Sequence, residues 1–408
     1  MADGKKPSDI ALFGPDMLAD PHPVYARLRA EDPVHWHEKF GAWILTRYDD
    51  VDTALREPRL SSTLTDIIRA PQDAAARRDM QALYTFVANS MVFADPPHHT
   101  RLRALTAKAF TARAVEALRP RVEALAGELL DAKQNAGGMD AVWDFAFPFP
   151  ITVMLALLGI SAEDGVRIKR WCDGFLVPFG RAPDALSPAE RREAGESGAA
   201  LRAYVGDLVE SARKNPSDGL VSALVRAADG GDRLNADELF ATIILLLIAG
   251  HENMTALLGC AVLEFARHPD QWKKLGEEPA LIEGAVEELL RYLSPNQFIR
   301  RRALDDVPLG GKTIRKGDLV FLILAAANRD PVRFPDPDRL DIARPHARNV
   351  ALGHGFHFCL GGALAKMETE IALASLRKHV PVLTLGTERP EYADNHNVRS
   401  LKGLKLVW

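Results

Sequence analysis

The chain has 408 residues and a net charge of −4, with 51 basic side chains against 55 acidic ones. This balance excludes the strongly basic composition typical of nucleic-acid-binding proteins, and the length allows one large domain or two of medium size. The three cysteines, Cys172, Cys260 and Cys359, lie far apart in the sequence. Their odd number argues against a disulfide framework and indicates a reducing compartment.

The first 20 residues are polar and predict an irregular lead-in, which leaves residues 21–408 for a single domain. They show neither a signal peptide nor a membrane anchor. The longest continuous apolar run, residues 243–250, is too short to cross a bilayer. We therefore expect a soluble, cytoplasmic protein.

Short elements are predicted near the N-terminus. Residues 23–30 favour a helix, and two apolar segments around Lys39-Phe-Gly41 favour a hairpin. A helix over residues 49–56 would start on an aspartate cap. Residues 57–93 have the composition of a loop.

The string Asp95-Pro-Pro-His-His-Thr-Arg-Leu-Arg103 predicts a helix start, because proline is tolerated in a first turn. His99 and Arg103 are four residues apart and share one helix face. Such a pair suits a carboxylate ligand, although by itself it would usually be a solvated face.

Helical spacing continues through residues 112–135 and 151–158. Residues 162–213 favour two helices around a break rich in proline and glycine. A longer helix follows, since Asn235 and Glu238 form a capping-box pattern and no breaker appears before His268-Pro269. At about 1.5 Å per residue, this helix would span roughly 50 Å.

The middle of the long helix reads Ala249-Gly-His-Glu-Asn-Met-Thr255. A glycine followed by an acid is costly in a buried helix unless the gap or the acid has a use. Further on, Glu288 and Arg291 are three residues apart, which alone would indicate a weak surface pair. Residues 318–324 and 404–408 have the pattern of strands.

The most informative stretch is Ala351-Leu-Gly-His-Gly-Phe-His-Phe-Cys-Leu-Gly-Gly-Ala363, which places four glycines around Cys359. A helical pattern begins directly after it. Glycine permits backbone turns with positive φ and close approach of another group. A helix N-terminus favours a thiolate, so Cys359 is suited to binding a flat metal cofactor.

Taken together and in order, these strings resemble the cytochrome P450 family, of the soluble bacterial type, over residues 20–408. The resemblance implies a mainly α, single-domain fold with small β-sheets. It also implies haem b as cofactor, with Cys359 as axial thiolate, a ligand that favours O–O cleavage. The family usually has Phe seven residues before this cysteine, where this chain has Leu352, so the redox potential is left open.

Further roles follow from the resemblance. His99, Arg103, Arg301 and His357 would bind the haem propionates. Glu288, Arg291 and Arg339 would form a structural ion network behind the haem. The two helices within residues 162–213 would act as a lid over the substrate pocket. The side chains implied for that pocket are Phe86, Val87, Met91, Phe175, Leu246 and Phe298.

The long helix resembles the distal helix of the family, in which Ala249 and Gly250 would open a groove for O₂. Glu252 would relay protons. The family has an alcohol at the next position, where this chain has Asn253. Thr255 lies about 200° further round the helix and cannot simply replace it. An amide can donate and accept hydrogen bonds, so Asn253 is expected to organise water there.

The implied function is monooxygenation of a hydrophobic small molecule, such as a terpenoid, a polyketide or a fatty acid. Electrons would come from a separate ferredoxin and its reductase, docked at a basic surface; the candidates by position are Lys108, Arg113, Arg348 and Lys366. The Asn253 departure leaves oxidative coupling or peroxide-driven oxidation open. A non-catalytic haem sensor and a zinc site at His354, His357 and Cys359 are the remaining alternatives.

Overall fold

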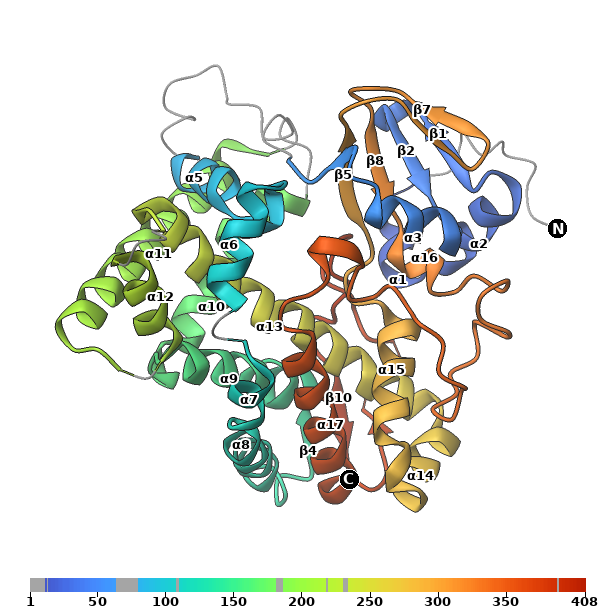
Figure 1. Ribbon diagram of the computed structural model, residues 1–408. Helices are drawn as coiled ribbons and strands as arrows, with labels where there is room; N and C mark the ends of the chain where they lie inside the picture. Colours follow the sequence, from blue (N-terminus) through green and yellow to red (C-terminus); the bar gives the residue numbers. More distant parts are fainter. Residues whose placement is uncertain are drawn as a thin grey trace. The chain divides into compact units, whose positions relative to one another are not determined.

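A computed structural model of the chain describes residues 12, 14–63, 80–107, 110–180, 186–217, 219–229, 234–386 and 389–408 (Figure 1). The chain divides into two compact units. Unit 1 comprises residues 1–61, 119–149 and 252–408, and unit 2 comprises residues 62–118 and 150–251.

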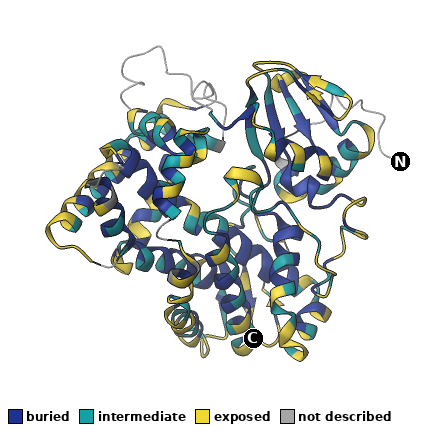
Figure 2. Cartoon of the chain, in the orientation of Figure 1, coloured by how far each residue is buried: buried dark blue, intermediate teal, exposed yellow. Residues whose placement is uncertain are grey.

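Unit 1 contains a five-stranded sheet in the order β1–β2–β8–β5–β3. Strands β2 and β8 are parallel, and the other neighbours are antiparallel. The strands are mostly buried, as the dark blue of Figure 2 shows. Their bounds are β1 (Val34–His37), β2 (Ala42–Leu45), β3 (Leu60–Ser61), β5 (Ile299–Ala303) and β8 (Leu319–Leu322).

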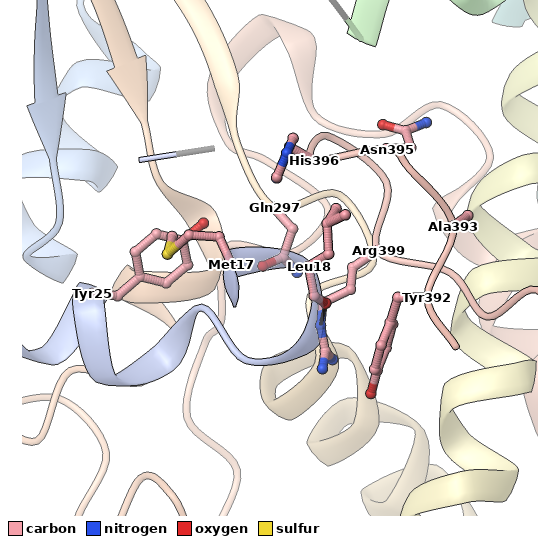
Figure 3. Close-up of a pocket in the computed structure, with 9 residues that line it drawn as sticks. All are labelled: Met17, Leu18, Tyr25, Gln297, Tyr392, Ala393, Asn395, His396 and Arg399. Carbon is pink, nitrogen blue, oxygen red and sulfur yellow. Dashed lines mark hydrogen bonds between the residues drawn. The ribbon is translucent and has the colours of Figure 1, made fainter. Parts of the chain in front are cut away.

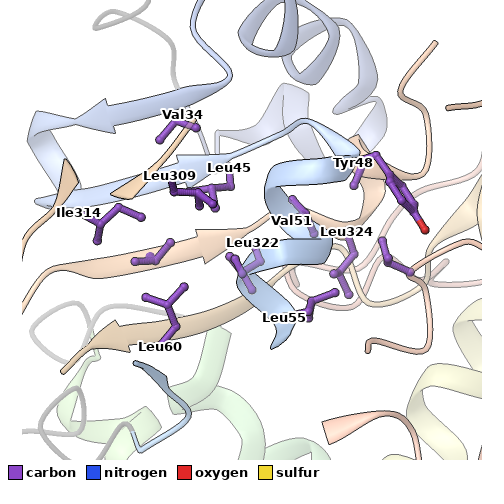
Figure 4. Close-up of a cluster of buried hydrophobic side chains, with 14 of the residues drawn as sticks. Val34, Leu45, Tyr48, Val51, Leu55, Leu60, Leu309, Ile314, Leu322 and Leu324 are labelled. Atoms are coloured by element: carbon purple, nitrogen blue, oxygen red, sulfur yellow. The ribbon is translucent and has the colours of Figure 1, made fainter. Parts of the chain in front are cut away.

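Helix α3 (Tyr48–Arg56) packs against this sheet. Its residues Val51 and Leu55 lie four apart on one face and enter the same buried cluster as Leu45 and Leu322 (Figure 4). This cluster holds α3 against the sheet. Helix α3 in turn contacts η9 (Gly355–His357), in the loop that contains Cys359.

The remaining elements of unit 1 are mainly helices, with two smaller sheets, β4–β10–β9 and β6–β7. The C-terminal half of α13 also belongs to this unit. The bounds are α1 (Pro15–Ala19), α2 (His22–Glu31), η2 (Glu38–Phe40), α8 (Arg119–Asp131), β4 (Gly138–Asp140), η4 (Ala141–Ala146), α14 (Pro269–Glu277), η8 (Pro279–Leu281), α15 (Ile282–Leu293), β6 (Val307–Leu309), β7 (Lys312–Ile314), α16 (Leu324–Ala327), η9 (Gly355–His357), α17 (Gly362–His379), β9 (Thr384–Leu385) and β10 (Lys405–Val407).

The described part of unit 2 is helical and includes most of α9 and the N-terminal half of α13. The bounds are α5 (Gln81–Asn89), η3 (Met91–Phe93), α6 (His98–Ala107), α7 (Ala112–Glu116), α9 (Pro148–Leu158), η5 (Ala162–Asp164), α10 (Gly165–Leu176), η6 (Val177–Gly180), α11 (Pro188–Lys214), α12 (Leu220–Asp229) and α13 (Ala236–Arg267).

The predicted capping box at the start of α13 is confirmed. The N–H of Glu238 donates to Asn235 Oδ1 at 2.9 Å, and the N–H of Asn235 donates to Glu238 Oε2 at 3.0 Å. The predicted hairpin is confirmed as β1–β2, and the predicted pair of helices within residues 162–213 as α10 and α11.

Several predicted boundaries were wrong. Residues 81–93 form α5 and η3 instead of a loop, because Leu83, Phe86 and Val87 supply a buried helix face. The helical pattern over residues 112–135 is divided into α7 and α8, with Pro120 in the first turn of the second helix. Helix α3 starts after Arg47, not on an aspartate cap.

Two helical stretches, Ala141–Leu158 and Ala236–Arg267, are long and apolar enough to cross a membrane by length and composition alone. Neither stretch is an uninterrupted apolar run, so the length of the longest such run did not indicate them. In each stretch 67% of the window is buried inside the protein. Burial of this extent is what the core helices of a globular protein show, and we interpret both stretches in that way.

Candidate functional site

Cys359 lies in a tight loop three residues before the start of α17. Its N–H donates to the carbonyl of Leu352 at 2.9 Å, which closes the loop. Gly353 and Gly355 have φ of +72° and +69°, a conformation that favours glycine. Because Cys359 is partly exposed and close to a helix N-terminus, its sulfur can meet a ligand as a thiolate.

The loop is tied to α3 at two points. His354 Nδ1 pairs with Asp52, whose carboxylate also accepts a 2.7 Å bond from Arg56. Burial would raise the pKa of Asp52, but the hydrogen bond from His354 and the charges of His354 and Arg56 hold that pKa below its ordinary value. At Gly355 a Cβ would lie 3.0 Å from the carbonyl of Leu55, so the loop approaches α3 closely.

One of these contacts concerns the alternative of a zinc site at His354, His357 and Cys359. His354 Nδ1 is paired with Asp52, which argues against its use as a metal ligand. Among the described residues, no group of three or more His, Cys, Asp or Glu side chains is arranged to hold a metal ion. The three cysteines, all of them described, form no disulfide.

The predicted ion network around Glu288 exists, but one of its predicted members was wrong. Glu288 accepts from Arg291 Nε at 2.7 Å and from Arg344 Nε at 3.1 Å. Arg339 contributes its carbonyl oxygen, while its side chain is exposed. In the segment that contains Arg339, the side chain that reaches the Glu288 carboxylate is that of Arg344. The backbone N–H of Asp341, in the same segment, also donates to Glu288, at 3.0 Å.

On α13, two of the predicted site residues, Ala249 and Gly250, belong to unit 2. Ala249 is exposed, whereas Gly250 faces the side chain of Met154 in α9. A Cβ at Gly250 would lie 2.1 Å from Met154 Cε. The missing side chain at Gly250 therefore makes room for Met154, a packing role that the sequence did not indicate.

The next turn of the same helix belongs to unit 1. Glu252 Oε1 accepts a 3.3 Å hydrogen bond from the Asn395 amide. Asn253 is partly buried, and its Oδ1 is a buried oxygen that accepts no hydrogen bond from the residues that the structure describes. A buried oxygen without a donor costs about 1–3 kcal/mol, so this position suits a water or hydroxyl donor.

Helix α6, in unit 2, carries His99 and Arg103. His99 is 1% exposed, and Arg103 is partly buried. The helix is held by Glu238 of α13, which pairs with His98 Nε2 at 3.0 Å and with Arg101. Glu238 thus serves two purposes, as a helix cap and as an anchor for α6, and only the first was readable from sequence spacing.

Most of the predicted pocket side chains lie inside the units. Phe86 and Phe175 stack edge to face at 5.5 Å and are 3% and 0% exposed. Val87 and Leu246 are also buried, and Met91 is partly exposed. Phe298 packs against Phe321 in a hydrophobic cluster of unit 1. These five buried side chains are packing residues here, and their contact with substrate stays a prediction.

The comparisons with known proteins agree with this arrangement. A family profile described as Cytochrome P450 matches residues 191–403. The chain is 42% identical to the vitamin D(3) 25-hydroxylase of Pseudonocardia autotrophica, over 97% of this chain and 96% of that protein. It is 38% identical to the 6-deoxyerythronolide B hydroxylase of Saccharopolyspora erythraea, over 92% and 93%.

The chain belongs to the cytochrome P450 family. Its fold is the P450 fold as well: the tirandamycin C-bound P450 monooxygenase TamI superposes with a TM-score of 0.85 at 39% identity, over 97% of this chain and 98% of that one. The protein is accordingly an oxidoreductase of the monooxygenase class, and the P450 cofactor is haem b with an axial cysteine thiolate.

The residues present fit this cofactor. Phe356 and Phe358, on either side of His357 in the cysteine loop, are 37% and 40% exposed, which suits contact with a flat apolar ring. Arg301, on β5, is only 7% exposed. Burying a guanidinium to this extent is favourable where it lies beside a hydrogen-bond acceptor or an anion, such as a carbonyl oxygen or a propionate. His357 is partly buried in the same loop.

Proposed function

We propose that this P450 inserts one oxygen atom from O₂ into a C–H or C=C bond of a hydrophobic small molecule in the bacterial cytoplasm, with Cys359 as the axial thiolate. The observation that carries the proposal is the position of Cys359 in its glycine-rich loop before α17. When bound, the haem supplies the iron at which O₂ is reduced and split. Two electrons come from a separate ferredoxin and reductase.

The substrate class is proposed from the relatives and from composition. Two relatives are named for hydroxylating vitamin D(3) and 6-deoxyerythronolide B, and one solved relative holds tirandamycin C. We therefore place the substrate among secondary metabolites, such as terpenoids or polyketides, with fatty acids as the next class. Titration of the ferric protein with a panel of these compounds tests this proposal: a substrate shifts the Soret band to high spin, and a panel without any shift contradicts the assignment.

Docking of the ferredoxin is proposed at a basic surface near the cysteine loop. Arg348 is exposed, whereas Lys366 pairs with Glu287, which lowers its value as a docking charge. Arg113 is exposed in unit 2, and Lys108 lies outside the described residues.

Glu252 is proposed to deliver protons during O₂ reduction. Its carboxylate is partly exposed and held by an amide donor, so one oxygen is fixed while the group stays in reach of solvent. His99, Arg103, Arg301 and His357 are proposed to hold the propionates, and Ala249 to border the O₂ site.

Glu252→Gln should slow turnover by roughly tenfold to a hundredfold, because removal of a positioned proton donor has an effect of at least this size. Haem content and substrate affinity should be unchanged. Glu264→Gln is a matched control, because Glu264 lies further along the same helix and pairs with Arg267 at 2.9 Å. Steady-state turnover with saturating ferredoxin measures the effect, and undiminished turnover of Glu252→Gln would refute the relay.

Asn253→Ala should raise the release of hydrogen peroxide per electron consumed. The buried Oδ1 of Asn253 suits a water that takes part in proton delivery, and alanine cannot hold that water. Asn253→Thr, which restores the family alcohol, should keep product formation coupled to electron use. The ratio of peroxide to product is the measurement; an unchanged ratio in Asn253→Ala would leave Asn253 as an ordinary polar helix residue.

A further inference from the structure

A turn near the C-terminus, residues 393–399, holds the side chain that contacts Glu252. The turn is short and strongly hydrogen-bonded: the N–H of Asn395 donates to the carbonyl of Ala393 at 2.8 Å, and the N–H of Ala393 donates to Ser400 at 2.9 Å. Figure 3 shows Asn395 and His396 on this turn, in a pocket that Gln297 also lines. All of these residues belong to unit 1, as does Glu252.

The turn is fixed to the segment that precedes β5. The N–H of Gln297 donates to the carbonyl of Asn397 at 2.8 Å, and the N–H of Arg399 donates to Pro295 at 3.0 Å. The amide of Asn397 adds a 3.1 Å bond to Asn296 Oδ1. The two backbone bonds therefore fix the turn to residues 295–297, and the direction of its side chains is correspondingly restricted.

Only the NH₂ group of the Asn395 amide can face Glu252, because the amide oxygen is used elsewhere. Its Oδ1 accepts the N–H groups of Asn397 at 2.9 Å and Val398 at 3.1 Å. These two bonds use both lone pairs of the oxygen. The NH₂ group is thereby directed at Glu252 Oε1, 3.3 Å away, as a donor. A donor aimed at a carboxylate is a charge-assisted hydrogen bond, which is stronger and more directional than a neutral one.

We propose that Asn395 is a positioning residue for Glu252: it donates to one carboxylate oxygen and so fixes the orientation in which the carboxyl group takes up and releases the proton. This inference rests on the proposed relay role of Glu252. Asn395 itself transfers no proton, because its amide is locked by the bonds to the turn. Its contribution is to restrict the rotation of the Glu252 carboxylate, so that the oxygen that exchanges protons keeps one orientation.

The test uses Asn395→Asp in the full-length haem protein. Aspartate retains an oxygen for the N–H groups of Asn397 and Val398, so the turn is kept, but it presents an oxygen instead of a donor to Glu252. We expect kcat to fall by up to about tenfold, the rate equivalent of one hydrogen bond. Substrate affinity from the Soret titration should be unchanged. Asn397→Ala is the control and should retain kcat, because it removes only the side-chain bond to Asn296 and leaves the two backbone bonds that fix the turn.

A double-mutant cycle separates positioning from a general structural effect. In a Glu252→Gln background, Asn395→Asp should cause little further loss of kcat, because the group through which Asn395 acts is already removed. A further loss equal to that in the wild type would overturn the inference. Urea unfolding of Asn395→Ala, Glu252→Ala and the double variant gives a readout independent of turnover: the double variant should lose less stability than the sum of the two single variants.

The outcomes distinguish this inference from the proposed function. Full-rate turnover by Glu252→Gln would refute the relay and, with it, the role of Asn395. Slow turnover by Glu252→Gln combined with full-rate turnover by Asn395→Asp would leave the relay standing and overturn the positioning role alone.

Discussion

Cys359→Ser should abolish monooxygenation. The family's axial thiolate donates electron density that favours O–O cleavage, and a serine hydroxyl at the same place is a far poorer donor. We expect the turnover rate to fall by more than about a hundredfold. Substitution of a residue that only supports a metal ligand costs about tenfold to a hundredfold, and loss of the ligand itself should cost more. The carbon monoxide complex of the reduced protein should also lose the Soret band that is characteristic of thiolate ligation.

Cys260→Ala is the control for this substitution. Cys260 is a buried thiol on α13 whose Sγ lies 3.6 Å from the carbonyl of Arg399. Burial raises the pKa of Cys260 to about 11, so it remains a protonated thiol at neutral pH. Its removal should leave the thiolate spectrum intact. A thiolate spectrum retained by Cys359→Ser, or lost in Cys260→Ala, would mean that the axial ligand has been assigned to the wrong cysteine.

Glu288→Gln should destabilise the protein by about 3–5 kcal/mol, the usual cost of leaving buried charges without their partner. Glu288 and Arg291 are 3% and 2% exposed, and Arg344 contributes a second guanidinium. Without the carboxylate, the guanidinium groups of Arg291 and Arg344 would face one another with no anion between them. Arg291 would also lose the orientation that directs it to the carbonyls of Asn328 and Pro337.

Equilibrium unfolding in urea measures this loss. Glu283→Gln is the control, because Glu283 is an exposed residue of the same helix, and surface substitutions usually change stability by less than about 0.5 kcal/mol. Equal stabilities of Glu288→Gln and Glu283→Gln would show that the buried ion network contributes nothing to the fold.

Local sequence rules predicted much of the fold. The capping box of Asn235 and Glu238 is set by two residues three positions apart, and the β1–β2 hairpin by two apolar segments around Gly41; both depend on contacts between near neighbours. Glu288 and Arg291 also pair within one turn of helix. In these cases the interaction is encoded by spacing, which explains why the sequence was sufficient.

Contacts between distant segments were not predictable in this way. Arg339 and Arg344 lie in the same loop, and only the path of its backbone decides which guanidinium reaches Glu288. Met154, from another helix, packs against Gly250, and no local pattern signals that contact. Asn395 and Glu252 are 143 residues apart, and no local pattern signals their hydrogen bond.

The alternatives can be weighed against these contacts. A non-catalytic haem sensor has no need for an acid held by a dedicated donor, so the Asn395–Glu252 bond favours an enzyme that moves protons. Asn253, in place of the family alcohol, gives some weight to peroxide-driven oxidation and oxidative coupling. The coupling ratio of Asn253→Ala bears on this point, and turnover with peroxide in the absence of a reductase would favour the first of these reactions.

The most direct test of the account is the origin of the oxygen atom in the product. The ligand with the largest high-spin shift should be turned over with a ferredoxin and reductase under isotope-labelled O₂, and the product examined by mass spectrometry. We predict that one labelled oxygen atom enters the product for each two electrons consumed. A product without label, or a coupled product that contains no new oxygen, would contradict monooxygenation as the function of this P450.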